Sequence, residues 1–426
     1  MIEIAIIRDE KERLIAGLRK KNVADEQIAM IDLIVAEDDK RKSTQTTLDG
    51  LLSKSNKLSD DIGRLFQQGK ASDANLLKAE VAAIKEETKV LEVTLKDIKD
   101  GIDAMIIQLP NIPHQSVPEG NKPEDNEVFR SWDKTMPDLG PDALPHWELA
   151  EKYNLISFKD GVKLTGAGFP VYKGKGARLQ RALINFFLDE ASNAGYQEIQ
   201  PPILVNKESA TATGQLPDKE GQMYYCDKDD FYLIPTAEVP ITNLYRDTIL
   251  KKSDFPVKMA GYTPCFRREA GSYGSDVKGL NRLHQFDKVE LVQLQHPDQS
   301  YDTLMQMVEH VESLLKKLEL PYRVLRLCGG DMSFNSALTY DLETYSAAQG
   351  RWLEVSSVSN FETFQSNRMK LRFKDEDGKT RLAHTLNGSA LALPRIVATM
   401  LENHQTKDGI KIPVALQPYT GFTIIN

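Results

Sequence analysis

The stretch Cys265-Phe-Arg-Arg-Glu-Ala-Gly-Ser-Tyr-Gly-Ser-Asp-Val-Lys-Gly-Leu-Asn-Arg-Leu-His-Gln-Phe-Asp-Lys-Val-Glu290 decides the fold and the chemistry expected of this chain. It predicts a strand that ends in arginines, a glycine-rich turn, and a return strand that carries Phe286 and Glu290. A guanidinium fork can clamp a phosphate or carboxylate bidentately, and an aromatic ring on the neighbouring strand can stack on a base. Taken alone, Arg-Arg-Glu is more often a surface charge cluster than a clamp, so the whole string has to be considered.

Beyond this stretch, short runs typical of strands alternate with amphipathic helical segments. The expected strands span residues 196–205, interrupted by two prolines, and then 231–234, 286–293, 351–358 and 381–386. Few connections between them follow the strand, helix, parallel strand rhythm of a doubly wound fold. We therefore expect an α+β fold, with a mainly antiparallel sheet flanked by helices.

The first hundred residues follow a different pattern, in which apolar side chains recur in alternating steps of three and four. Such steps place one apolar stripe along a helix, as in a coiled coil. The first stripe comprises Leu51, Leu58, Ile62 and Leu65, and the second comprises Leu77, Val81, Ile84, Leu91, Leu95, Ile98, Ile102 and Met105. In the short link between them, Gly69 suits a helix stop and Ser72 an N-cap. Two helices joined so closely are expected to form an antiparallel hairpin.

The hairpin is expected to project as an arm, because Glu37, Arg41 and Thr44 occupy its stripe where a core would be apolar. If the first helix starts near Ala24, it has about 45 residues and a length of about 65 Å. Three prolines within the nine residues 110–118 preclude a helix there and mark a linker. We therefore expect two domains, at residues 1–110 and 111–426. By itself, the first is more often a generic coiled-coil interaction module.

Composition places the 426-residue chain among ordinary folded proteins, with 41% hydrophobic and 27% charged residues. The net charge of −8 argues against a generally basic nucleic-acid coat, because phosphate binding needs clustered lysine and arginine. Three widely separated cysteines encode neither a disulfide framework nor a zinc cluster, and they fit a reducing compartment. Because neither a signal peptide nor a membrane span is expected, the cytoplasm is the expected location.

Two glycine-rich segments fail as nucleotide-binding motifs. Gly166-Ala-Gly168 lacks the third glycine of a dinucleotide fingerprint, and residues 271–279 lack the Gly-Lys-Ser/Thr ending of a P-loop. If the chain uses ATP, it must do so through another fold.

Taken whole, residues 265–290 resemble motif 2 of the class II aminoacyl-tRNA synthetases, and in detail that of the seryl-tRNA synthetase family. Residues 195–204 resemble motif 1, which forms the dimer interface in the family. Further segments agree in order and spacing: Thr213-Gly-Gln-Leu-Pro217 and Thr236-Ala-Glu-Val-Pro240 for serine, Glu354-Val-Ser-Ser357 for ATP and metal, and Asn387-Gly-Ser389 with Leu393-Pro-Arg395 for motif 3. The resemblance covers nearly the whole chain, and this joint agreement is far more specific than any single motif.

The resemblance implies a role for each matching residue at the nucleotide. Arg267 would bridge the substrate carboxylate and the α-phosphate, and Arg395 would face the β- and γ-phosphates, so that electrostatic neutralisation is the catalyst. Phe286 would stack on the adenine, while Glu269 and the backbone of Leu283 would meet its edge. The implied ATP-binding set is Arg267, Arg268, Glu269, Leu283, Phe286, Glu354, Val355, Ser356, Ser357 and Arg395, with Arg268 as phosphate or tRNA support.

The resemblance assigns serine recognition to Thr236, Ala237, Glu238, Glu290 and Ser389. Serine is small, so its recognition must depend on polar groups. A site that hydrogen-bonds a hydroxyl rejects alanine because buried acceptors would be left unpaired, whereas a close wall must exclude the extra methyl of threonine. Two carboxylates suit a substrate with an ammonium and a hydroxyl, and which carboxylate meets which group stays open.

Glu354 and Ser357 offer hard oxygen ligands for Mg²⁺, which normally bridges phosphate oxygens. The lack of a Cys/His zinc set separates the chain from the zinc-using seryl enzymes of some archaea. The chain therefore resembles the common, bacterial-like type, with ATP as substrate, Mg²⁺ and no zinc.

The resemblance implies a homodimeric ligase that charges tRNA(Ser) with L-serine and also charges tRNA(Sec) where one exists. The arm, as a tRNA-binding domain, would lie against the long variable region of the tRNA, and the second domain would be catalytic. Local basic groups would then hold the tRNA despite the acidic total: Lys40, Arg41, Lys42, Lys54, Lys57 and Arg64 on the arm, and Lys278 and Arg282 in motif 2.

Two alternative functions stay open. The first is amino-acid activation for a carrier protein, against which the two apolar stripes argue because that group of relatives lacks the long arm. The second is a non-catalytic RNA-binding paralogue. The presence of the full set of matching residues argues against loss of activity: Arg267, Glu269, Glu290, Glu354, Ser389 and Arg395.

Overall fold

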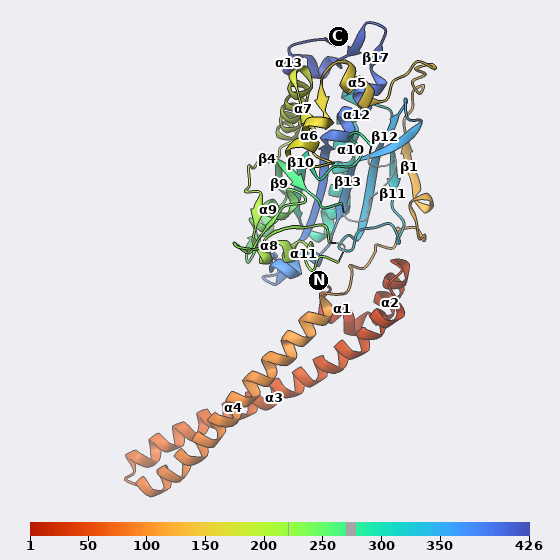
Figure 1. Ribbon diagram of the computed structural model, residues 1–426. Helices are drawn as coiled ribbons and strands as arrows, with labels where there is room; N and C mark the ends of the chain where they lie inside the picture. The colour runs from red at the N-terminus through yellow and green to blue at the C-terminus, as the bar shows by residue number, and fades with distance from the viewer. Residues whose placement is uncertain (220, 270–277) are drawn as a thin grey trace. The chain divides into compact units, whose positions relative to one another are not determined.

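The structure is a computed structural model that describes residues 1–219, 221–269 and 278–426 (Figure 1). The glycine-rich turn expected within the motif 2 stretch falls mainly in residues 270–277, outside the described residues. The chain divides into two compact units, Met1–Arg19 with Val23–Pro110 and Lys20–Asn22 with Asn111–Asn426.

The first unit is a hairpin of two long helices accompanied by two short ones (Figure 1). Its helices are α1 (Ile4–Asp9), α2 (Lys11–Lys20), α3 (Asp25–Gln67) and α4 (Ala71–Ile106). The predicted helical arm is confirmed, and α3 has 43 residues. The predicted cap at Ser72 is wrong, because α4 begins at Ala71 and Lys70 occupies its N-cap position. The chain turns between the helices at Gly69, whose φ of +74° favours glycine.

The facing stripes of α3 and α4 bury apolar side chains at the predicted helical spacing. The buried apolar positions are Ile28, Ile31, Ile34 and Leu48 on α3, and Ala74, Val81, Ile84, Leu95, Ile102 and Ile106 on α4. Towards the turn, Leu51, Leu58, Ile62 and Leu65 are only half-buried. A two-helix hairpin covers each stripe from one side alone, so this partial exposure follows from the geometry.

The polar middle of the arm is organised around Asp38, whose side chain is 1% exposed. Its carboxylate receives Nη1 of Arg8 at 3.0 Å, Nε of Arg41 at 2.7 Å and Nζ of Lys42 at 3.3 Å. Burial by itself would raise the pKa of Asp38, but the hydrogen bonds from Arg41 and Lys42 hold it below its usual range. The arm therefore replaces part of an apolar seam with a satisfied ionic cluster.

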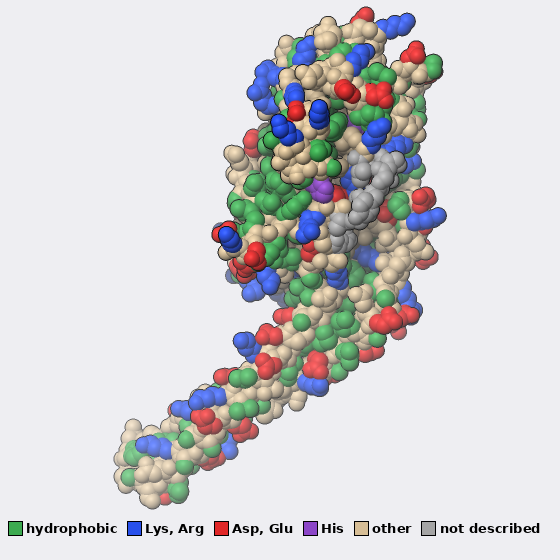
Figure 2. All heavy atoms as spheres, viewed as in Figure 1, with side chains coloured by type: hydrophobic (Ala, Val, Ile, Leu, Met, Phe, Trp, Pro, Cys, Tyr) green, Lys and Arg blue, Asp and Glu red, His purple; other side chains and the backbone are tan. Residues whose placement is uncertain are grey.

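Charges of both signs alternate over the visible face of the arm (Figure 2). Lys54 on α3 pairs with Glu80 on α4 at 2.8 Å, and Lys40 pairs with Glu37 at 2.6 Å. Each of these lysines is therefore paired with a carboxylate close by, so it adds little to the net charge of its part of the arm.

The second unit is built, within its described residues, on one eight-stranded sheet. In spatial order its strands are β1 (Glu127–Ser131), β11 (Tyr322–Arg326), β12 (Leu338–Ser346), β13 (Arg351–Asn360), β16 (His384–Ala392), β10 (Gln285–Gln295), β9 (Val257–Phe266) and β4 (Gln197–Glu198). All neighbours pair antiparallel except β4 and β9, which pair in parallel. The predicted α+β class with a mainly antiparallel sheet is confirmed.

Both faces of the central strands are covered. Residues 288–295 of β10 are buried without interruption, although successive strand residues point to opposite faces. Helices α7 (Gly174–Asn193), α10 (Ser300–Lys317) and α12 (Leu393–Asn403) contribute buried side chains to the same core. Their apolar residues recur at helical spacing, for example Leu179, Leu183 and Phe187 on α7.

The predicted strands appear with shifted boundaries. Residues 286–293 and 351–358 lie within β10 and β13, and residues 231–234 correspond to β7 (Phe231–Leu233). The run 196–205 contains only β4 and β5 (Leu204–Val205), because Pro201 and Pro202 lack the amide hydrogen that a ladder needs. The prediction of a single strand at residues 381–386 is wrong, because these residues include the end of β15 (Thr380–Leu382) and the start of β16.

The remaining elements are short connections around this sheet. They are η1 (Pro123–Asp125), α5 (His146–Lys152), β2 (Ile156–Ser157), α6 (Phe158–Leu164), β3 (Val171–Tyr172), α8 (Lys207–Ala212), β6 (Tyr224–Cys226), α9 (Glu238–Asn243), β8 (Ile249–Lys251), η2 (Lys252–Asp254), η4 (Pro297–Gln299), α11 (Phe364–Met369), β14 (Arg372–Lys374), β17 (Gln405–Thr406), β18 (Gly409–Lys411), η5 (Val414–Leu416), α13 (Gln417–Thr420) and β19 (Ile424–Ile425). Among the described residues, no helix is both long enough and apolar enough to cross a membrane.

Candidate active site

A cavity of about 630 Å³ opens in the second unit, over the sheet strands β10, β13 and β16. Strand β10 supplies Phe286, Lys288 and Glu290, which are two residues apart along the strand and therefore share one face. Strand β16 supplies Asn387 and Ser389, and residue pairing places Ser389 directly opposite Glu290. Residues far apart in sequence are therefore brought together by the ladder between two central strands.

One end of the cavity is a buried polar pocket around Glu290. Thr236 Oγ1 donates to Glu290 Oε2 at 2.9 Å, and Lys288 Nζ forms an ion pair with the same carboxylate. Lys288 Nζ also donates to Thr236 Oγ1 at 3.0 Å. The side chains of Lys288 and Glu290 are 8% and 2% exposed, so their charges are withdrawn from water and paired with each other.

A second carboxylate, Glu238, lies in the same pocket. Its Oε1 accepts from Gln365 Nε2 at 2.6 Å, and its backbone amide donates to Thr236 Oγ1 at 3.2 Å. Burial, together with the negative charge of Glu290, raises the pKa of Glu238 to about 7. The pocket thus holds two carboxylates and one lysine. This excess of acidic groups suits a small cationic ligand.

The other end of the cavity combines arginine with an aromatic ring. The guanidinium carbon of Arg267 lies 5.2 Å from the centroid of the Phe286 ring, within cation–π distance. Arg267 follows directly after β9, and its amide donates to the carbonyl of His284 at 2.9 Å. This bond continues the β9 and β10 pairing past the strand end and directs the arginine over the ring.

Glu269 and Leu283 form the neighbouring wall. The carboxylate of Glu269 makes an ion pair with Nε of Arg282, and its backbone has a φ of +48°. The Leu283 side chain is buried at 4% exposure and lines the cavity. A flat apolar surface beside a carboxylate and a backbone edge is suited to the stacking and edge recognition of a base.

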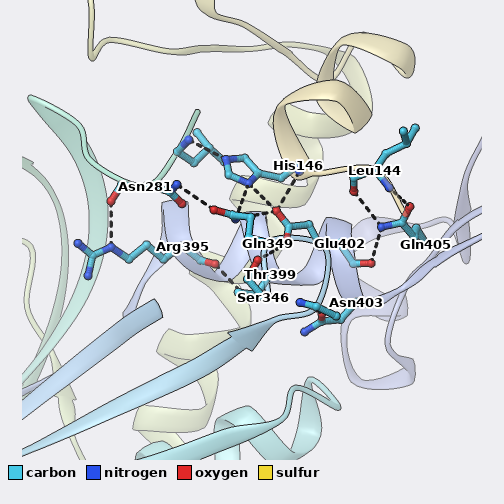
Figure 3. A network of polar contacts seen from close by, with 12 residues as sticks. Leu144, His146, Asn281, Ser346, Gln349, Arg395, Thr399, Glu402, Asn403 and Gln405 are labelled. Atoms are coloured by element: carbon cyan, nitrogen blue, oxygen red, sulfur yellow. Dashed lines mark hydrogen bonds and ion pairs between the residues drawn. The ribbon is translucent and has the colours of Figure 1, made fainter. Parts of the chain in front are cut away.

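Arg395 enters the cavity from the first turn of α12. Its Nε donates to the carbonyl of Asn281 at 3.0 Å (Figure 3) and its Nη1 donates to the carbonyl of Glu354 at 2.7 Å. The Nη1 atom also lies 3.6 Å from the Glu354 carboxylate. Two backbone carbonyls, from different segments of the chain, therefore hold this guanidinium at the wall.

Oxygen ligands line the same wall on β13. Glu354 presents a half-exposed carboxylate, and Ser357 lies opposite Asp341 in the β12 and β13 ladder. Burial and the nearby charge of Glu354 raise the pKa of Asp341 well above its usual range. Carboxylate and hydroxyl oxygens are the donors that Mg²⁺ prefers, so the donor set fits that ion. Among residues 1–219, 221–269 and 278–426, no group of three His, Cys, Asp or Glu side chains is arranged to hold a metal.

Most of the site residues predicted from the sequence line this one cavity. They are Thr236, Glu238, Arg267, Glu269, Leu283, Phe286, Glu290, Glu354, Val355, Ser356, Ser357, Ser389 and Arg395. Ala237 is fully buried and Arg268 is exposed, and neither contributes to the lining. Ser356 also joins two strands, since its Oγ donates to the Ser389 carbonyl at 2.6 Å.

Several polar lining residues were not assigned to the site from the sequence, among them Lys288, Asn387, Asn281 and Asn335. Lys288 had a usable signal, because it precedes Glu290 by two residues on a strand and must share its face. Asn387 had the same relation to Ser389. Asn281 and Asn335 lie in irregular connections, where no periodicity indicates a direction.

The comparisons with known proteins agree over both units. The seryl-tRNA synthetase N-terminal domain model matches residues 1–113, and the tRNA synthetase class II core domain model (G, H, P, S and T) matches residues 224–404. A serine--tRNA ligase of Salinibacter ruber is 50% identical over 427 residues, which cover 100% of this chain and 99% of that protein. That of Prosthecochloris aestuarii is 44% identical, with 100% and 99% coverage.

Solved structures give the same result. The crystal structure of seryl-tRNA synthetase from Pyrococcus horikoshii complexed with ATP has a TM-score of 0.92 and 33% identity, and the match covers 100% of this chain and 99% of that one. A cytoplasmic serine-tRNA ligase from Naegleria fowleri in complex with AMP has a TM-score of 0.87 and 25% identity, with 100% and 99% coverage. The sheet, the arm, the site segments and the full-length identity together show that this chain belongs to the seryl-tRNA synthetase family.

Proposed function

We propose that this protein is a serine--tRNA ligase, which activates L-serine with ATP and transfers the serine to tRNA(Ser). The observation that carries the proposal is the cavity itself. It joins a buried pocket with two carboxylates, Glu238 and Glu290, to an arginine and aromatic wall made by Arg267, Phe286 and Arg395. Such a cavity can hold a small amino acid and a nucleoside triphosphate end to end.

In the first half-reaction, a serine carboxylate oxygen forms a bond to the α-phosphorus of ATP while the bond to the pyrophosphate oxygen breaks. The products are seryl-adenylate and pyrophosphate. No general base is needed, because the attacking carboxylate carries no proton. Arg267 would lie between the two anions and neutralise the charge that builds up between them, and Arg395 would do the same at the leaving group.

Serine would be selected by the polar pocket. Its ammonium and hydroxyl would pair with the groups around Thr236, Glu238 and Glu290, all of which are at most 5% exposed. Alanine would leave buried acceptors unpaired, which costs about 1–3 kcal/mol for each group. Threonine would bring a methyl group against the closed wall.

Glu354 and Ser357 would hold Mg²⁺ beside the phosphates, where the ion would neutralise phosphate charge and act as a Lewis acid. We also propose a homodimer assembled through the motif 1 region, a cytoplasmic location, and charging of tRNA(Sec) where one exists. The domain assignment belongs to the same proposal, with residues 1–110 as the tRNA-binding arm and residues 111–426 as the catalytic domain.

The full-length agreement with serine--tRNA ligases, arm included, favours this function over the two alternatives of carrier-protein loading and a non-catalytic RNA-binding role. The test is an exchange and charging panel on the purified protein. Serine should drive exchange of labelled pyrophosphate into ATP and should be transferred to bulk tRNA, whereas threonine, alanine and cysteine should give little of either product. Absence of serine-dependent exchange at every Mg²⁺ concentration would overturn the proposal.

A further inference from the structure

A buried polar network lies at the C-terminal end of α12 (Figure 3). His146, at the start of α5, is fully buried, and its Nδ1 lies 2.8 Å from Glu402 Oε1. Glu402 is also fully buried and receives Ser346 Oγ on its other oxygen. Burial by itself would raise the pKa of Glu402, but the hydrogen bonds from His146 and Ser346 hold it below its usual range.

The second ring nitrogen of His146 faces the active-site wall. The backbone amide of Leu280 donates to His146 Nε2 at 2.9 Å, which makes Nε2 an acceptor and places the ring proton on Nδ1, towards Glu402. Gly279 lies directly against this ring. A Cβ atom at Gly279 would come 2.2 Å from His146 Nε2, and its φ of +68° is itself a glycine conformation.

Asn281, the next residue along this wall, is held by the same network. Gln349 Nε2 donates to Glu402 Oε1 at 2.8 Å, and Gln349 Oε1 accepts from the side-chain amide of Asn281 at 3.2 Å. The carbonyl of Asn281 in turn accepts from Arg395 Nε at 3.0 Å. The network therefore begins at Glu402 and ends on the guanidinium that lines the cavity.

Helix α12 connects the two ends of this arrangement. Arg395 and Glu402 are seven residues apart, so they share one helical face about 10 Å apart along the axis. Arg395 holds the carbonyl of Asn281, and Glu402 holds the amide of Leu280 through His146. Leu280 and Asn281 are thus fixed from two points on one rigid helix, beside Leu283 of the same wall.

We propose that His146, with Glu402 and Gln349, is a positioning residue for ATP: it fixes the backbone of Leu280 and Asn281, and through them the Arg395 guanidinium and the Leu283 wall. This inference depends on the proposed function, since it assumes that the wall binds the nucleotide. His146 touches no substrate and takes no part in the chemistry. Its contribution lies in holding the wall in its binding geometry before ATP arrives.

Two substitutions at one position separate this role from simple loss of packing. H146N keeps a donor near Nδ1, towards Glu402, but removes the acceptor of the Leu280 amide. H146Q reaches further and keeps an acceptor near the position of Nε2. H404N is the matched control, because His404 adjoins the end of α12 and bonds the Leu318 carbonyl at 3.0 Å instead of the 279–283 segment.

For each variant, the Kd of ATP is measured by calorimetry, the KM of ATP and of serine by pyrophosphate exchange, and the Tm by thermal unfolding. Hydrogen exchange is followed on a peptide spanning residues 278–284. We expect H146N to weaken ATP binding about tenfold, to leave the serine KM within twofold, and to speed exchange of the Leu280 amide. H146Q should recover most of the ATP affinity and of the amide protection, whereas H404N should change Tm alone.

Unchanged ATP affinity and unchanged Leu280 protection in H146N would overturn the inference. It would also be overturned if H146N, H146Q and H404N weakened ATP in proportion to their loss of Tm, since that is the behaviour of a purely structural residue. Failure of the proposed function is a separate result, seen as the absence of serine-dependent exchange by the unsubstituted protein. Calorimetry and hydrogen exchange still decide the inference in that case, because neither requires turnover.

Discussion

The arm and the active-site cavity both bury charged side chains, but they satisfy them in different ways. In the arm, Asp38 is surrounded by cations whose own side chains are 25–52% exposed, so these cations stay partly solvated by water. In the cavity, Glu290 and Lys288 are both withdrawn from water, and Glu238 lies beside them. Buried charge therefore contributes to stability in the arm, whereas in the cavity it is held ready for a ligand.

The strongest test of this contrast is a matched pair of arginines. Arg267 lines the cavity, whereas its neighbour Arg268 is exposed and does not. We expect R267A to lower kcat/KM for pyrophosphate exchange by about a thousandfold or more, because it removes charge neutralisation at the reacting centre. R268A should lower it less than about fivefold. Equal effects of the two substitutions would contradict the placement of Arg267 at the reacting anions.

The next test removes one region and keeps the other. Deletion of residues 24–105, bridged by a flexible linker, should leave serine-dependent pyrophosphate exchange within about threefold, because the cavity is built from the second unit alone. Serine transfer to tRNA should fall about a hundredfold or more, since the proposed phosphate contacts of the arm would be lost. Circular dichroism and gel filtration of the shortened protein serve as folding controls. Undiminished charging would refute a tRNA-binding role for the arm.

The same contrast explains how far sequence reasoning succeeds. In the arm, Val81, Ile84 and Leu95 repeat at a spacing that by itself predicts a helix stripe, and the structure buries these residues as expected. Helix ends were less predictable: Ser72 has cap chemistry, yet the helix starts one residue before it. The reason is that Gly69 allows the turn to be tighter than the cap preference suggests.

From local pattern alone, the cavity was predictable only where its residues adjoin in sequence, and the distant segments were assigned through the family resemblance. The motif 2 stretch placed Phe286 and Glu290 on one strand face through a period of two, and Lys288 could have been found by the same rule. The pair His146 and Glu402 could not, because 256 residues separate its members and nothing local indicates that they meet. A single histidine with no other polar motif nearby in the sequence gives no sign of a site, because most such residues are hydrogen-bonded core residues.

A third prediction concerns the ionic cluster in the arm. D38A removes the carboxylate that Arg8 and Arg41 share and leaves a gap between the helices. It should therefore destabilise the arm by about 1–3 kcal/mol. Hydrogen exchange of arm amides in the full-length protein measures this locally. D39A is the control, since Asp39 contacts Arg8 but is 60% exposed, and it should cost less than about 0.5 kcal/mol. A D38A variant as stable as the parent would mean that the cluster only tolerates the charge.

A fourth prediction follows from Glu238. Because its pKa is raised to about 7 without ligand, this carboxylate is protonated below that pH and ionised above it. An ion pair with the serine ammonium needs the ionised form, so with Glu238 as that partner the KM for serine should rise by up to about tenfold for each pH unit below 7. E238Q should raise the KM overall and remove this slope. The same slope in E238Q would assign the titration to another group.

The same raised pKa carries a stability effect of opposite direction to that of Asp38. A carboxylate whose pKa is higher in the folded protein binds more protons there than in the unfolded chain. Its destabilising contribution therefore appears as the pH rises from about 4.5 to about 7 and is complete above that range. Asp38, whose pKa is held low, instead loses its stabilising contribution as the pH falls through its own folded-state pKa.

The smallest expected effect is at the surface of the arm, where Lys54 and Glu80 form a pair with side chains 55% and 43% exposed. K54A should change the free energy of arm opening by less than about 0.5 kcal/mol, because solvent screens both charges. If Lys54 instead serves the tRNA, K54A should reduce the slope of log affinity against log salt by about one unit for tRNA(Ser). E80A, which frees the lysine, should leave that slope intact. A stability loss without a change in slope would make Lys54 a structural residue, like the cations that pair with Asp38.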